Sequence, residues 1–125
     1  MTPSVLLVDD DAMIRRSLSS FLGRAGYEVH TAEDGAPAIA SPLSPDLVVV
    51  DFNMPTCGLE VVRHFKTRLG AAVYVIAMTG GDEETRDESI AAGADAVLSK
   101  PFLPSELKRR LAEGTASLLS VAVAS

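Results

Sequence analysis

The chain has 125 residues, of which 47% are hydrophobic and 22% charged, and its formal net charge is −6. This length suits a single domain that buries about two-thirds of its unfolded surface. No apolar run reaches the roughly 20 residues that cross a membrane, and the N-terminus lacks the basic start of a secretory signal. We therefore expect a cytoplasmic globular protein without a membrane partner, whose acidic balance argues against nucleic-acid binding by this domain.

Cysteine and histidine offer little chemistry in this chain. The single cysteine, Cys57, excludes an internal disulfide and suits a reducing compartment. The two histidines, His30 and His64, have no spacing typical of metal ligands. We interpret both histidines as surface or packing residues.

The first half of the chain alternates predicted strands and helices. Residues 4–8 form an apolar run that predicts a buried strand, and apolar residues then recur at helical spacing from Ala12 until Gly26. Residues 28–32 predict a shorter, more polar strand at the sheet edge, followed by a weak helix over 35–40. The central strand, residues 47–50, is apolar throughout, as in a parallel sheet covered on both faces.

The second half repeats this alternation. A helix is predicted up to Leu69, a strand over 72–78, and a helix that begins with acidic residues near Asp82 and runs to about residue 92. A short strand over 96–99 and a helix from Pro104 follow. Five strands alternating with five helices predict an α/β fold with a parallel sheet and right-handed crossovers.

The end of the chain leaves three alternatives open. We expect one domain over residues 1–125 with a core of about 4–113, and no charged residue follows Glu113. The tail of residues 114–125 is accordingly a prolonged last helix, a frayed end or the stub of a linker.

Polar side chains gather where the predicted strands end. Asp51 closes the central strand, and Pro55 opposes a simple continuation. The other strand ends contribute two carboxylates, a hydroxyl and an ammonium, at Asp9, Asp10, Thr79 and Lys100. In open α/β sheets, ligands bind beyond the carboxyl ends of the strands. Each residue alone fits a solvated loop, but their coincidence at one edge favours a site.

The chemistry of this set points to phosphoryl transfer. Clustered carboxylates repel one another and either take up protons or recruit a cation. Oxygen ligands without a complete protein cage suit Mg²⁺, which keeps several waters and shares a phosphate. The sequence therefore predicts a carboxylate nucleophile, a divalent metal and two phosphate-holding groups around one phosphoryl group.

Four motifs resemble those of the receiver domains of bacterial two-component response regulators. They are, in chain order, Val8-Asp9-Asp10, Asp51-Phe52-Asn53-Met54-Pro55, Thr79-Gly80 and Lys100-Pro101-Phe102. The resemblance covers residues 4 to about 113. It implies a doubly wound (βα)5 flavodoxin-like fold, with sheet order 2-1-3-4-5 and helices on both faces, and a cis Lys100-Pro101 bond.

The resemblance also implies a role for each site residue. Asp51 is expected to be the phosphoacceptor, with Thr79 and Lys100 holding phosphoryl oxygens. Asp10 and Asp51 would ligate Mg²⁺ directly. Asp9 would act mainly through water, and Asn53 through its backbone carbonyl.

The implied function is a phosphorylation-controlled signalling domain that catalyses only its own modification. The phosphoryl donor would be a sensor histidine kinase, a histidine phosphotransfer protein or a small acyl phosphate. A downstream protein would bind the face of the fourth helix, fifth strand and fifth helix. Two alternatives stay open: a phosphate relay or sink for a histidine phosphotransfer protein, and a phosphorylation-independent binding module.

Three features depart from the family pattern. The loop after Asp51 is one residue short before Gly58 and lacks the usual acidic residue. Val97 stands where relatives carry a switch aromatic, three residues before the lysine. Gly81 offers no side chain to position or block an attacking water.

Overall fold

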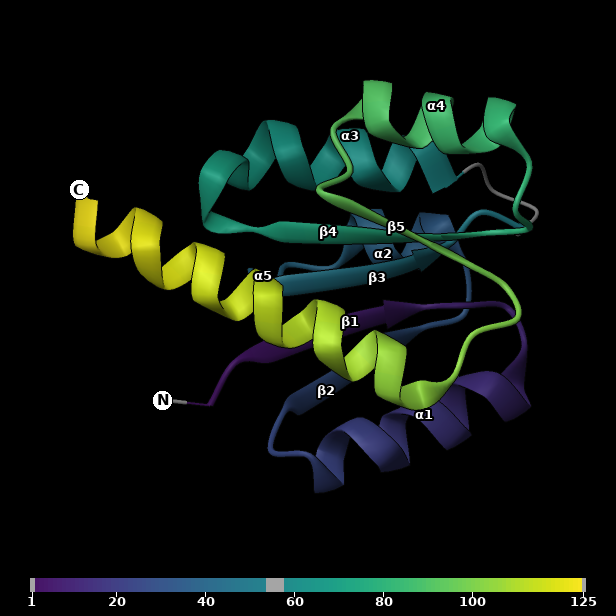
Figure 1. Ribbon diagram of the computed structural model, residues 1–125, viewed down its shortest axis with the longest axis horizontal. Helices are drawn as coiled ribbons and strands as arrows, with labels where there is room; N and C mark the ends of the chain where they lie inside the picture. Colours follow the sequence, from purple (N-terminus) through teal and green to yellow (C-terminus); the bar gives the residue numbers. More distant parts are fainter. Residues whose placement is uncertain (1, 54–57, 125) are drawn as a thin grey trace.

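The computed structural model describes residues 2–53 and 58–124, which form a parallel five-stranded sheet in the order β2-β1-β3-β4-β5 (Figure 1). The elements are β1 (Ser4–Val8), α1 (Ala12–Arg24), β2 (Glu28–Ala32), α2 (Gly35–Ala40), β3 (Leu47–Asp51), α3 (Gly58–Leu69), η1 (Gly70–Ala72), β4 (Tyr74–Thr79), α4 (Glu83–Ala92), β5 (Ala96–Ser99) and α5 (Pro104–Ala124). The predicted fold class and strand order are confirmed. β2 is an edge strand, as its polar sequence predicted.

The central strand β3 is buried on both faces because helices cover each side of the sheet. Leu47 and Val49 join the apolar cluster under α1 and α5, while Val48 and Val50 join the cluster under α2 and α3. All five residues of β3 are buried. This explains why the strand reads as a continuous apolar run rather than an alternating one.

Side chains fix the starts of two helices beside the sheet edge that carries the polar residues. Asp11 Oδ1 accepts hydrogen bonds from the N–H groups of Met13 and Ile14 at 2.9 and 3.2 Å, which starts α1. Asp82 starts α4, and the hydrogen bond from the Thr85 N–H lowers the pKa of Asp82. Such caps satisfy the free N–H groups of a first turn.

The start of β4 differs from the sequence-based prediction, and the end of α5 decides between the alternatives that the sequence left open. The strand predicted over 72–78 begins at Tyr74, because Gly70–Ala72 form a 3-10 turn that holds Val73 outside the sheet. α5 continues to Ala124, so residues 114–124 are helical. Despite this length, no helix in the described part of the chain is long and apolar enough to span a bilayer.

His30 is a surface residue and His64 is a packing residue, as the sequence predicted. His30 Nε2 is 3.2 Å from Glu28 Oε1 on the edge strand. His64 is half-buried, and its ring meets that of Phe65 edge-on with centroids 5.0 Å apart.

Gly114 packs against the sheet with no room for a side chain, and it gives a test of the packing. A Cβ at Gly114 would lie 2.5 Å from the Tyr74 ring and 2.9 Å from Leu47. Gly114→Ala should therefore destabilise the fold by about 1–3 kcal/mol despite the better helix propensity of alanine. The matched control is Gly23→Ala in α1, where nothing lies within 4 Å, which should stabilise by about 0.5–1 kcal/mol. Urea unfolding of both variants measures this. Equal gains in both would mean that α5 lies farther from Tyr74.

Candidate functional site

The carboxyl ends of β1, β3, β4 and β5 bring the predicted polar side chains to one edge of the sheet. In Figure 1 this is the edge to which the strand arrows point. Asp51 and Thr79 are the last residues of β3 and β4, while Asp9 and Lys100 directly follow β1 and β5. The fold thus assembles residues that are up to 91 positions apart, as the strand ends predicted.

Three carboxylates form a compact acidic cluster. One oxygen from each of Asp9, Asp10 and Asp51 lies within 4.8 Å of the others. Asp9 and Asp51 are buried, whereas Asp10 is exposed. Burial raises the pKa of Asp9, and the charges of Asp51 and Asp10 add to this, whereas the Asp11 N–H and Lys100 act in the opposite direction.

The hydrogen bonding of Asp9 shows that its side chain has capacity for a ligand. Its Oδ1 accepts from the Asp11 N–H at 2.9 Å, but its Oδ2 is buried and has no hydrogen-bond partner among the described residues. A buried carboxylate oxygen that accepts no hydrogen bond, on a residue clustered with two other carboxylates, fits a hard divalent cation such as Mg²⁺. The donor set therefore suits the metal that the sequence predicted.

Lys100 supplies positive charge to this cluster. Its Nζ lies 3.1 Å from Asp51 Oδ2 and 3.8 Å from Asp9 Oδ2. Its backbone N–H donates to the Thr79 carbonyl at 2.8 Å, which ties the end of β5 to β4. The Lys100-Pro101 bond is cis, as expected. A single ammonium thus lies between two buried carboxylates.

Thr79 and Asn53 flank Asp51 differently. Thr79 is fully buried, and its Oγ1 accepts a long hydrogen bond of 3.4 Å from the Gly81 N–H. Among the described residues no acceptor takes the Thr79 hydroxyl hydrogen. Asn53 is exposed, and its N–H donates to Asp51 Oδ1 at 2.9 Å. Asn53 thereby orients the carboxylate through its backbone.

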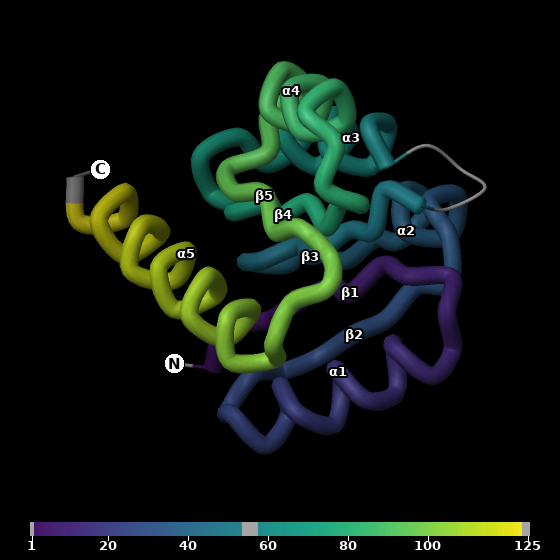
Figure 2. The backbone as a smooth tube through the Cα atoms, turned by 45° about the vertical axis from the view of Figure 1, so that its right-hand side comes forward, coloured from purple at the N-terminus to yellow at the C-terminus, as the bar shows by residue number. Residues whose placement is uncertain are grey.

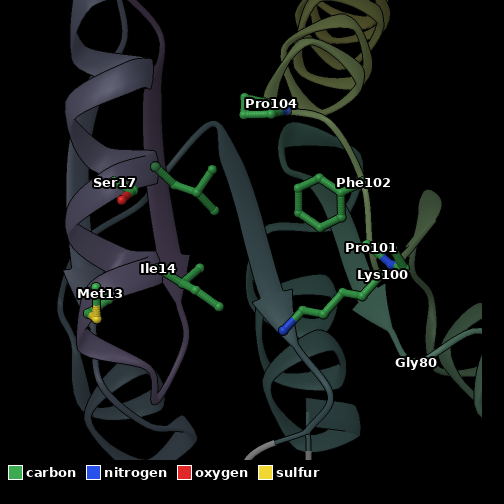
Figure 3. Close-up of a pocket in the computed structure, with 9 residues that line it drawn as sticks. Met13, Ile14, Ser17, Gly80, Lys100, Pro101, Phe102 and Pro104 are labelled. Atoms are coloured by element: carbon green, nitrogen blue, oxygen red, sulfur yellow. The ribbon is translucent and has the colours of Figure 1, made fainter.

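A cavity of about 630 Å³ lies beside the site, and the sequence did not indicate it (Figure 3). Its walls come from Met13 and Ile14 on α1 and from Phe102 and Pro104 after β5, with Lys100 at its edge. Phe102 stood next to the Lys-Pro pair in the sequence, but nothing placed its ring opposite α1.

Arg15 is a further residue that the sequence did not single out. Its Nη1 donates to the Asp9 backbone carbonyl at 2.7 Å and so ties α1 to the end of β1. Its position one helical turn after the Asp11 cap was the only available signal.

The three departures from the family pattern have different outcomes. The short loop after Asp51 falls on residues 54–57, which lie outside the described residues. Val97 is half-buried in β5 and lines a cavity of about 300 Å³ together with Arg86, Ile90 and Arg110. Gly81 has a φ of +99°, a conformation that favours glycine. The backbone conformation therefore explains why a glycine stands at this position.

This fold and edge define a phosphoacceptor signalling domain, and comparison with known proteins agrees. The chain matches the response regulator receiver domain over residues 5–112. It is 37% identical over 113 residues to the phosphate regulon transcriptional regulatory protein PhoB of Pseudomonas aeruginosa, covering 86% of this chain and 49% of that protein. It is also 37% identical over 110 residues to the transcriptional regulatory protein ResD of Bacillus subtilis, covering 86% and 45% respectively.

Solved structures give the same result. The BeF3-activated receiver domain of DrrB, from Thermotoga maritima, superposes with a TM-score of 0.86 at 30% identity, covering 93% of this chain and 99% of that one. The chemotaxis response regulator CheY4 of Vibrio cholerae superposes with a TM-score of 0.81 at 35% identity, covering 91% and 99%.

The chain belongs to the response regulator receiver domain family. It is a phosphorylation-controlled signalling domain of the two-component type. Receiver domains work with kinases and typically use Mg²⁺ at an acidic pocket. The chain spans about half the length of the curated relatives it matches.

The raised pKa of Asp9 gives a test of the crowded charges. In metal-free buffer at pH 7, Asp9→Asn should stabilise the fold by about 1 kcal/mol, because it removes a buried negative charge that the charges of Asp51 and Asp10 repel. The advantage over the parent should shrink as the pH falls through the raised pKa, since Asp9 then takes up a proton in the folded state. Thermal unfolding between pH 4 and 8 with a chelator measures both effects. A less stable variant across this range would mean that Lys100 outweighs the repulsion.

Proposed function

We propose that Asp51 is the residue that accepts the phosphoryl group, from a phosphohistidine of a sensor kinase or phosphotransfer protein or from a small acyl phosphate. The observation that carries this is the Asp51 carboxylate, held at the end of β3 by the Asn53 N–H on one oxygen and by Lys100 on the other. A carboxylate oriented on both oxygens is a positioned nucleophile. The domain modifies only itself and turns over no other substrate.

The residues that would hold Mg²⁺ are the Asp9, Asp10 and Asp51 carboxylates together with the Asn53 backbone carbonyl. The buried Asp9 Oδ2, which accepts no hydrogen bond from the described residues, supports this assignment. When bound, the ion would offset the negative charge that gathers on the carboxylates and phosphoryl oxygens.

The side chains of the site have separate tasks in the transfer. A carboxylate oxygen of Asp51 forms the new O–P bond while the P–N bond of the donor breaks, and the donor ring nitrogen keeps the electron pair. Lys100, already 3.1 Å from Asp51 Oδ2, pairs with an oxygen of the arriving group. The Thr79 hydroxyl donates its hydrogen to another of these oxygens. That hydrogen is available because Thr79 Oγ1 acts as the acceptor, not the donor, in its hydrogen bond with the Gly81 N–H.

The output surface in this proposal is the face of α4, β5 and α5. Arg86, Ile90, Val97 and Arg110 surround its cavity of about 300 Å³. A downstream protein binds there when Asp51 is phosphorylated. With a net charge of −6, the domain itself does not bind nucleic acid, and as in its family it works in the cytoplasm.

Val97 supports a second candidate, in which the domain binds its partner regardless of phosphorylation. A ring three residues before the lysine would fill the cavity between α4 and α5, whereas Val97 leaves it open. The relay or sink role needs only the acceptor and its holders. The phosphorylation test that follows applies to all three candidate functions. The test of the amide spectrum separates the phosphorylation-controlled domain from the phosphorylation-independent module.

Phosphorylation should add a single phosphoryl mass at Asp51. Incubation with acetyl phosphate and Mg²⁺, followed by intact mass spectrometry, should show this mass, and a chelator should abolish it. Asp51→Asn should remove it, because an amide is a poor nucleophile. The matched control Asp87→Asn, on exposed α4, should be labelled like the parent. If the Asp51→Asn variant were labelled as fully as the parent, and the label mapped to a residue other than the neighbouring aspartates, the acceptor would lie elsewhere.

The amide spectrum should show a damped switch. With beryllofluoride and Mg²⁺, large shifts should cluster over residues 79–89 and fade toward Leu107 and Leu111, since Val97 cannot carry a ring inward. The variant Val97→Tyr should extend the shifts to α5. Equal responses of α5 in parent and variant would contradict this account, and no shift beyond the immediate site would favour the phosphorylation-independent module.

A further inference from the structure

A short turn joins the end of β1 to α1 and carries two of the three clustered carboxylates. Figures 1 and 2 both show the chain leaving β1 at the site edge and turning directly into α1. Asp9 and Asp10 lie in this turn, between β1 and the Asp11 cap of α1. The geometry of the turn therefore sets the direction of both carboxylates.

Asp9 is held through almost all of its polar groups. Its N–H donates to the Ala32 carbonyl at 3.1 Å, and its Oδ1 accepts from the Asp11 N–H at 2.9 Å. Its own carbonyl accepts from Arg15 Nη1 at 2.7 Å. Only its Oδ2 accepts no hydrogen bond from the described residues. These contacts fix the turn and leave one carboxylate oxygen for a ligand.

Asp10 has no comparable support of its own. Its side chain is exposed, and its carboxylate accepts no hydrogen bond from the described residues. The direction of this side chain therefore depends on the backbone that carries it. The planar peptide group before Asp10 contains the Asp9 carbonyl, so the hydrogen bond from Arg15 fixes the orientation of that peptide group.

Arg15 can hold this turn because α1 is itself firmly fixed. Leu18 and Leu22 bury the helix against the sheet, and Asp11 caps its first turn. Helical side chains point back toward the N-terminus of their helix, which brings a guanidinium near the start of α1 to the end of β1. Within the described part of the chain, the bond to Asp9 is the only hydrogen bond or ion pair of the Arg15 side chain.

We propose that Arg15 is a positioning residue for the metal: by holding the Asp9-Asp10 peptide group, it directs the Asp10 carboxylate toward the ion that Asp51 shares. This inference rests on the proposed function, because it takes the acidic cluster as the Mg²⁺ site. Arg15 acts through the backbone and not as a ligand, since a guanidinium has no acceptor for a metal. Asp9 is fully buried, so without Arg15 its carbonyl would lose this hydrogen bond and the turn would shift to replace it.

The variant Arg15→Met tests the proposal, because it keeps a long side chain with good helix propensity and removes the donor. MgCl2 is titrated into the full chain and followed by the amide shifts of Asp51 and Asn53. The dissociation constant should be about tenfold higher than that of the parent, as is usual when a group that orients a metal ligand is lost. The matched control Arg16→Met removes the same charge from an exposed neighbour that forms no hydrogen bond or ion pair with the described residues, so its constant should match that of the parent.

The kinetics of phosphorylation separate an effect on the metal from an effect on the phosphoryl group. With acetyl phosphate and Mg²⁺ well below its dissociation constant, Arg15→Met should react about tenfold more slowly than the parent, in line with its weaker metal binding. At saturating Mg²⁺ the two rates should agree. Arg15→Lys should recover most of the loss, because an ammonium can also donate to the Asp9 carbonyl. Circular dichroism checks that all variants fold.

Three results would overturn the role of Arg15 and leave the proposed function standing. The first is equal Mg²⁺ affinity in Arg15→Met and the parent. The second is an equal loss of affinity in Arg16→Met, since charge alone would then explain the effect. The third is a slow rate of Arg15→Met that persists at saturating Mg²⁺, which would place the effect on the phosphoryl group. A parent chain that binds no Mg²⁺ would instead contradict the proposed function and this inference together.

Discussion

The placement of Lys100 between two buried carboxylates is the interaction on which the site depends. Two unit charges 4 Å apart repel by about 4 kcal/mol at the effective dielectric of a protein surface, and Asp9 and Asp51 are both almost fully buried. Lys100 lies within 4 Å of both and offsets part of this repulsion. The pKa of Asp9 is nevertheless raised, first by burial and then by the charges of Asp51 and Asp10, and its Oδ2 accepts no hydrogen bond from the described residues. The three carboxylates at this edge outnumber the Lys100 ammonium, and a bound cation would offset the excess negative charge.

The fold and most of the site could be predicted because both depend on local patterns. An apolar run such as 47–50 fits a strand covered on both faces, and a parallel sheet gathers the residues that follow its strands at one edge. Asp9, Asp51, Thr79 and Lys100 were identifiable for that reason. The start of β4 was not, because Ala72 and Val73 are as apolar as the strand itself, and only the turn from Gly70 excludes them.

The features that the sequence did not indicate depend on contacts between distant elements. The cavity at Phe102 requires α1 to lie opposite the segment after β5. The Arg15 bond requires the guanidinium to reach back to the end of β1. Periodicity places residues on faces of single elements, but it does not say how far apart two facing elements stand. Cavities and bridging side chains therefore follow only from the three-dimensional packing.

Gly114 has a consequence for the geometry of the whole last helix. Because it has no side chain, the α5 backbone lies close against Tyr74 and Leu47 at that point, where an added Cβ would clash with both. Leu107 and Leu111 bury the earlier turns of the helix in the core under the sheet. The path of α5 is therefore fixed by contacts along the helix together with the close approach of its backbone at Gly114.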